Sequence, residues 1–132
     1  MAGCGGGSDG DQLSAKEYRE RGNRICRGAN REARRLARGR LRTQVENVAD
    51  AADRSRARFE RLEPPDELRA KHDEAVRNAR EALHLFREAD RNFERDGADA
   101  LLNVIEEIDR VVREGDAVAR QLGLTECATD VR

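Results

Sequence analysis

Three cysteines are the residues of this 132-residue sequence most able to form covalent bonds: Cys4, Cys26 and Cys127. In a bundle of four helices that alternate in direction, the end of the fourth helix returns beside the first half of the first. This topology predicts a disulfide between Cys26 and Cys127, which would stabilise a core poor in aromatic residues by roughly 4 to 5 kcal/mol. Such a disulfide also implies an oxidising compartment. The alternative is that Cys26 and Cys127 are two unrelated thiols.

Glutamate and histidine three residues apart, as at Glu81 and His84, form half of the ligand set of di-iron helical bundles. Such a site needs the same pair on a second helix, but the other histidine, His72, falls in the same predicted helix. Ala82 and Phe86 define the inner face there, so Glu81 and His84 should point outward. We therefore expect no metal ion and no cofactor.

His72 lies on the apolar stripe of its predicted helix, close to the turn at Pro64-Pro65. We expect it to be hydrogen-bonded and partly solvated at one end of the bundle, the alternative being a pH switch or a ligand contact. The sequence contains no Ser/His/Asp order, no P-loop and no glycine-rich turn from a strand to a helix. These features favour a protein that is not an enzyme.

A basic segment is the clearest candidate for a binding surface. Residues 15–42 contain 11 basic and 3 acidic side chains, whereas the whole chain has a net charge of -1. An arginine stripe in this segment could face anionic lipid headgroups, cell-wall polyanions or an acidic protein. Nucleic acid is a weaker candidate because no aromatic residues alternate with the arginines. The alternative is pairing with the acidic fourth helix, with little energy gained at the surface. The stripe consists of Arg24, Arg27, Arg31, Arg34, Arg35 and Arg38.

Composition limits the scaffold that could position these residues. The chain is 40% charged and 3% aromatic, and its mean hydropathy is -0.91. No stretch approaches the ~18 uncharged apolar residues of a membrane span, and a large aromatic-lined cavity is not expected. The 19 alanines and the near-zero net charge favour helices over disorder.

Apolar residues recur at alternating steps of three and four in four segments, which predicts four helices. The first begins at the capping box Ser14-Ala15-Lys16-Glu17, with Leu13 and Tyr18 as its hydrophobic staple, and ends near Gly39. The second begins at a capping box over residues 43–46 (Thr43-Gln44-Val45-Glu46) and stops at the two prolines. The third ends at Asp96-Gly97, and the fourth ends before Gly123.

The predicted fold is therefore all-α, an up-down-up-down four-helix bundle. Small residues on the inner stripes lead us to expect closely spaced helices. We divide the chain into a flexible glycine-rich leader and tether (1–12), the bundle domain (13–128) and a C-terminal tail (129–132).

The start of the sequence resembles the second half of a bacterial lipobox, in which small residues precede a cysteine that becomes lipidated. Here Ala2-Gly3 precede Cys4, and glycines follow it. Met1 stands where an aliphatic residue is usual, and no apolar signal segment precedes it. We expect such a segment upstream of Met1, or a chain cut near the processing site.

Motifs across nearly the whole chain resemble a group of small exported actinobacterial lipoproteins. They are Ile25-Cys26 with Ala29-Asn30 ("ICxxAN"), the central Pro64-Pro65-Asp66-Glu67-Leu68, and Gly123-Leu124 with Cys127 ("GLxxC"). The resemblance implies a helical domain anchored by a lipid on Cys4 to the extracytoplasmic face of the cell membrane, and it supplies no catalytic residues. The alternatives are a cytoplasmic protein that binds a polyanion such as nucleic acid, and a small metal-binding bundle.

Overall fold

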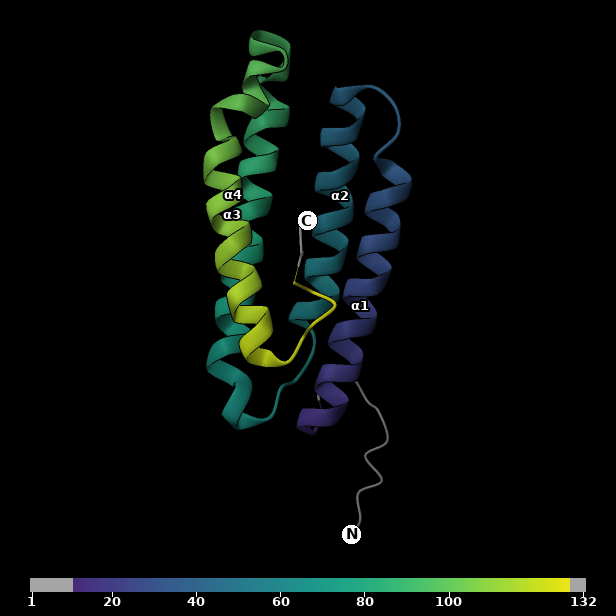
Figure 1. The fold of residues 1–132 in the computed structure, drawn as a ribbon, viewed down its shortest axis with the longest axis vertical. Coiled ribbons are helices and arrows are strands. Elements are labelled where there is room, and N and C mark those ends of the chain that lie inside the picture. The colour runs from purple at the N-terminus through teal and green to yellow at the C-terminus, as the bar shows by residue number, and fades with distance from the viewer. Residues whose placement is uncertain (1–10, 129–132) are drawn as a thin grey trace.

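A computed structural model describes residues 11–128 as four helices: α1 (Ala15–Leu36), α2 (Leu41–Glu60), α3 (Asp66–Asp96) and α4 (Asp99–Leu122). Consecutive helices run in opposite directions and pack against each other, α1 on α2, α2 on α3 and α3 on α4 (Figure 1). This confirms the predicted all-α four-helix bundle. Cys4, the predicted tail 129–132 and most of the predicted leader lie outside the described residues.

The predicted start of α1 is confirmed. The Ser14 hydroxyl accepts a hydrogen bond from the Glu17 amide at 3.1 Å, and the Glu17 carboxylate accepts one from the Ser14 amide at 3.4 Å. Leu13 and Tyr18 are both buried in the same apolar cluster. The Leu13 amide also donates to the Glu63 carbonyl at 2.8 Å, so the entry to α1 is tied to the α2–α3 loop.

The predicted start of α2 is wrong. The helix begins at Leu41 rather than at a Thr43 cap, and its N-cap, Arg40, makes no side-chain capping bond. Gly39 at φ 115° reverses the chain just before this point, so the helix can begin at once. The Gln44 side-chain amide, predicted inside the capping box, instead donates to the Gly39 carbonyl at 2.8 Å and closes the α1–α2 turn.

The other helix ends follow the predicted signals. Asp66 and Glu67 occupy the first turn of α3, where the helix dipole favours carboxylates. Gly97 (φ 60°) follows α3, and Gly123 (φ 78°) ends α4 in the left-handed conformation. The Leu124 amide then donates back to the Ala119 carbonyl at 2.8 Å, which turns the chain away from α4 and toward α1.

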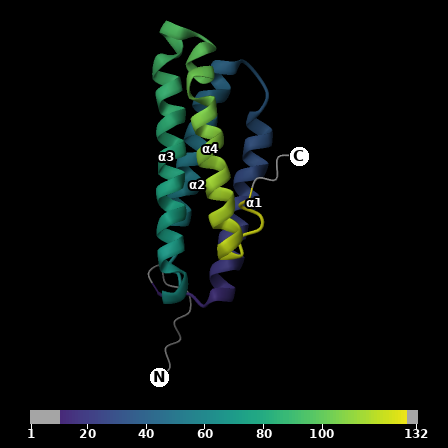
Figure 2. The same ribbon diagram turned by 60° about the vertical axis from the view of Figure 1, so that its left-hand side comes forward.

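The core consists of two buried apolar clusters separated along the bundle axis. The first contains Leu13, Tyr18, Val118, Ala119, Leu122 and Leu124. The second contains Val45, Leu85, Ala89, Val104, Ile108 and Val111. An apolar cavity lies among the four helices, so the expectation that small inner residues would bring all the helices close together is wrong. Principal packing joins only consecutive helices, and α1 and α4 are linked through the segment that follows α4 (Figure 2).

Candidate functional site

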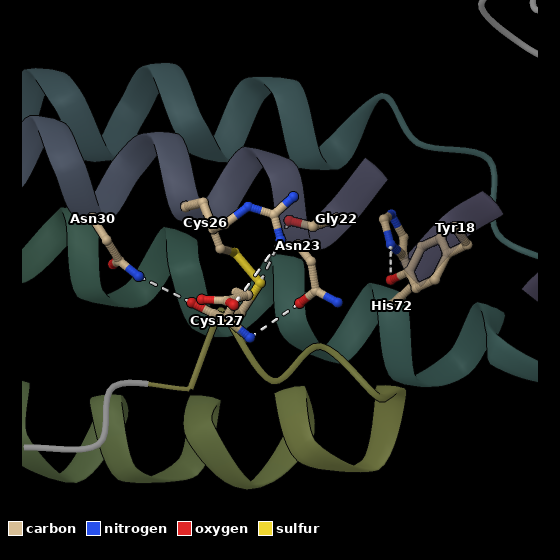
Figure 3. Close-up of a disulfide and its surroundings, with 9 residues drawn as sticks. Tyr18, Gly22, Asn23, Cys26, Asn30, His72 and Cys127 are labelled. Carbon is tan, nitrogen blue, oxygen red and sulfur yellow. Dashed lines mark hydrogen bonds and ion pairs between the residues drawn. A yellow bond between two sulfur atoms is a disulfide. The ribbon is translucent and has the colours of Figure 1, made fainter. Parts of the chain in front are cut away.

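A disulfide joins α1 to the segment that follows α4. Cys26 and Cys127 are bonded, with their α carbons 5.0 Å apart across 101 positions of sequence (Figure 3). The predicted pairing is thus confirmed. We call residues 123–127 the cover segment because they cross from α4 to α1 over the space between the two helical hairpins (Figure 1).

Two asparagines hold the backbone of the cover segment on either side of the disulfide. The Asn30 side-chain amide donates to the Glu126 carbonyl, and the Glu126 amide donates to the Asn23 side-chain oxygen, both at 3.0 Å (Figure 3). Asn23, Cys26 and Asn30 are spaced by three and four, so they share one face of α1. Asn30 belongs to the "ICxxAN" motif, but its contact with the cover segment was not predicted, and Asn23 was not singled out. The regular spacing of the two asparagines around Cys26 was a signal that could have found both.

Leu124 anchors the cover segment in the core. Its side chain is almost fully buried, and a β carbon at Gly22 would lie only 2.7 Å from its Cδ2 atom. Glycine at position 22 therefore provides the notch on α1 that Leu124 fills. The motifs "ICxxAN" and "GLxxC" form the two sides of this single joint, so their visible role is structural.

The cover segment lies over the apolar cavity, whose volume is about 350 Å³. All four helices line it with small or apolar side chains, together with Leu124 and the Cys26–Cys127 bridge. Phe59 and Phe86 are its aromatic residues, and much of the remaining wall is alanine or glycine. The lining includes Ile25, Ala52, Ala75, Ala79, Ala82, Val112, Gly115 and Ala119.

Polar groups in the cavity wall are few. The side-chain oxygen of Asn78 is buried without a hydrogen-bond partner and lies near Gly115 on α4. Arg56 also lines the cavity, and its guanidinium pairs with Asp53 at 2.9 Å and with Glu60. Ser55 and the buried Asp116 are the other polar residues of the wall, and the rest of the lining is apolar or glycine.

Glu81 and His84 are exposed, as expected for residues on the outer face of α3. Glu81 pairs with Arg110 of α4 at 2.9 Å. Within residues 11–128, no group of three or more histidine, cysteine, aspartate or glutamate side chains is placed to hold a metal ion.

His72 and Tyr18 form a buried polar pair at one end of the bundle. The Tyr18 hydroxyl and Nδ1 of His72 are hydrogen-bonded at 2.9 Å (Figure 3). The His72 ring also stacks on Phe59, with centroids 4.8 Å apart. The nearby Glu60 backbone carbonyl favours the protonated form of the ring. His72 is hydrogen-bonded as expected but is more deeply buried than predicted.

Burial sets the charge states of this pair. It lowers the pKa of His72 below its ordinary value of 6.5, and the nearby Arg69 adds to this, although Asp73 opposes it. Burial, together with Asp73, raises the pKa of the Tyr18 hydroxyl well above its ordinary value of 10. Both groups are therefore neutral at pH 7, which suits the hydrogen bond between Tyr18 and His72.

The His72 pair predicts a dependence of stability on pH. Below pH 6.5 the unfolded chain binds a proton at His72 that the folded chain does not, so the free energy of unfolding should fall as the pH drops from 6.5 toward the lower native pKa. The difference between the wild type and His72→Gln, measured by urea unfolding across this range, isolates the effect. The control His84→Gln removes the exposed histidine and should keep the wild-type profile. An identical profile for His72→Gln would contradict the prediction.

All six arginines of the predicted anion-facing stripe are exposed. Arg27 pairs with Glu126 of the cover segment at 4.0 Å, and Arg35 pairs with Glu32 of its own helix at 3.8 Å. On α4, the acidic residues Glu107, Asp109 and Glu114 pair with Arg110 and Arg113 of the same helix. The ion pairs seen within residues 11–128 therefore do not support the alternative that α1 uses its arginines to pair with α4.

In the described part of the chain, none of the helices combines the length and the apolar character needed to cross a membrane. Comparisons with protein families, curated proteins and solved structures find no match for this chain.

Proposed function

We propose that this protein is a non-catalytic binding module at the cell envelope, held at the extracytoplasmic face of the membrane by a lipid on Cys4. The observation that carries the proposal is the Cys26–Cys127 disulfide, because structural disulfides persist in oxidising compartments and are rare in the cytosol. The apolar cavity and the small number of polar groups in its wall support binding rather than catalysis. In this proposal residues 1–12 are the tether between the lipid anchor on Cys4 and the helical bundle.

The exposed arginine stripe supports an anionic surface or partner on one side of the module. Positive side chains attract anionic headgroups or cell-wall polyanions over about one Debye length, so they could orient a tethered domain. Lipid headgroups, a polyanion or an acidic protein would fit this surface equally well in charge. We give the stripe the secondary role of orientation because it contains no cavity of its own that is lined by apolar groups.

Thiol trapping and fractionation of cells that carry the native gene test the proposal. We expect Cys26 and Cys127 to resist maleimide labelling until a reductant is added, and the protein to leave the membrane fraction in a Cys4→Ser variant. The matched control, Cys127→Ser, should release the Cys26 thiol while leaving the protein in the membrane fraction. Free thiols at both Cys26 and Cys127 in the wild type, or unchanged fractionation of Cys4→Ser, would refute it.

A cytoplasmic protein that binds a polyanion is the second candidate, and the exposure of the six arginines favours it. It predicts reduced cysteines in cells and binding to nucleic acid that weakens steeply with salt. The same thiol trapping separates the two candidates, since only the extracytoplasmic module keeps its disulfide.

A further inference from the structure

The cavity is maintained by the choice of small side chains around it. Ala52, Ala75, Ala79, Ala82 and Gly115 all line it, and leucine at even two of these positions would fill much of its space. Unfilled apolar space lowers the free energy of unfolding, and a small core is least able to tolerate that loss. Its volume of about 350 Å³ lies in the range of small-molecule sites. These features favour a cavity that a ligand occupies.

The shape of the cavity favours a linear ligand. On α3 its lining residues run from Ala75 to Phe86, which corresponds to about 16 Å at ~1.5 Å per residue. On α2 the lining residues run from Ala52 to Phe59, and on α4 from Val111 to Ala119, so the apolar wall extends along the bundle axis. An elongated apolar wall suits an extended hydrocarbon chain better than a compact ring system.

A second hollow of about 420 Å³ lies across the outer surface of α2 and α3 and is strongly basic. We call it the basic basin. His84 and three arginines, at positions 80, 87 and 91, follow one face of α3 at steps of four, three and four, a pattern that the sequence analysis missed. Arg91 is exposed, and Asp53 is the acidic residue of the lining. The basin is lined by Asp53, Arg56, Arg80, Leu83, His84, Arg87 and Arg91.

Acidic residues of α2 order the basin without cancelling its charge. Arg80 pairs with Glu60, and Arg87 pairs with Asp50 at 2.8 Å. Arg56 pairs with both Asp53 and Glu60. Three arginines thus pair with three carboxylates, and Arg91, at the end of the row beyond the pair with Asp50, is the fourth arginine and has no ion pair within residues 11–128. An anionic group in the basin would complete the charge balance.

The cavity and the basic basin meet at Arg56 and Leu83, which line both of them. This boundary lies between the two ion pairs that cross from α2 to α3. We propose that the protein binds a single-chain amphiphile, with its hydrocarbon chain in the cavity and its anionic group in the basic basin. The inference rests on the proposed role as a binding module but not on the compartment or the lipid anchor.

Titration calorimetry of the oxidised full-length chain tests this inference with four probes: decanoate, 1-decanol, butyrate and decyl phosphate. We expect decanoate to bind about tenfold more tightly than 1-decanol, because charge-assisted hydrogen bonds to arginine add to the apolar contact. Butyrate, which has the charge without the chain, should show no measurable binding. Equal binding of decyl phosphate and decanoate would show that the site recognises any anionic head group. Stronger binding of decanoate would identify the source of the ligand as a fatty acid, and stronger binding of decyl phosphate would identify it as a phospholipid fragment.

Two pairs of matched variants locate the ligand. Ala79→Phe should fill the cavity and abolish binding of both decanoate and 1-decanol, whereas Ala117→Phe on the exposed face of α4 should leave both affinities unchanged. Arg91→Glu should remove most of the preference for decanoate, whereas Arg34→Glu, which makes the same change of charge on α1, should preserve it. Ala82→Leu is a milder block if Ala79→Phe unfolds, as monitored by circular dichroism.

Absence of decanoate binding, equal affinities for decanoate and 1-decanol, or unchanged binding by folded Ala79→Phe would overturn the inference. These outcomes can be distinguished from a failure of the proposed extracytoplasmic location. Free thiols in cells would refute the extracytoplasmic role even if decanoate bound, and an intact disulfide with no decanoate binding would refute only the ligand.

Discussion

Replacing both Cys26 and Cys127 by serine is expected to lower the free energy of unfolding by about 4 to 5 kcal/mol, the value of the chain-entropy model for a loop of this length. The bridge closes a loop across 101 positions, so its loss frees the ends of nearly the whole bundle in the unfolded chain. Urea unfolding of the oxidised wild type and of the double variant measures this difference in unfolding free energy. The readout is the helical circular dichroism signal at about 222 nm.

The control for this prediction is Cys4→Ser, which removes the third cysteine and leaves the bridge in place. It should unfold like the wild type when both chains lack a lipid. Reduction of the wild type should reproduce the effect of the double variant, since both cut the same covalent link. A loss below about 1 kcal/mol would mean that the contacts of the cover segment alone hold α1 against α4.

Loss of the bridge should also weaken the wall of the cavity. Leu124 and Cys127 both line it, and the bridge joins the cover segment to α1. The remaining ties of the cover segment include two hydrogen bonds and an ion pair to Glu126 and the Leu124 contact at Gly22. The Arg19 side chain of α1 also donates to the Leu122 carbonyl of α4 at 3.0 Å. Each such hydrogen bond contributes only about 1 kcal/mol net, so the disulfide dominates the joint.

The sequence predicted local helix signals better than it predicted the inner faces. Ser14 was recognisable because both halves of its capping box are close in sequence. Thr43 carried the same signature, but Gly39 allowed α2 to begin earlier, and an earlier start satisfies more backbone hydrogen bonds. Ala82 and Phe86 were placed on an inner face, and both lie there, yet they are only half-buried because they border the cavity.

The disulfide could be predicted because it follows from topology, which the four helical stripes determine. The asparagine contacts could not be predicted in the same way. Asn23 and Asn30 bind backbone atoms of Glu126, about a hundred positions away, and a backbone partner leaves no mark on the sequence. The cavity was missed for a related reason: small residues permit close packing of helices but do not enforce it.

Tyr18→Ala is expected to cost about 3 to 5 kcal/mol of unfolding free energy, the range for removing a large buried aromatic side chain. Tyr18 is fully buried, contacts Phe59 edge-on with centroids 6.2 Å apart, and is hydrogen-bonded to His72. Tyr18→Phe keeps the ring but leaves Nδ1 of His72 without its hydrogen-bond partner, so it should cost only about 1 to 3 kcal/mol. Urea unfolding of both variants and of the Tyr18→Phe/His72→Gln double variant separates packing from the hydrogen bond.

Equal losses of unfolding free energy for Tyr18→Ala and Tyr18→Phe would contradict the packing role. Additive losses for Tyr18→Phe and His72→Gln would contradict the coupling between the two residues. The expected pattern makes this end of the bundle a rigid base, on which the α2–α3 turn and the entry to α1 are held together below the cavity.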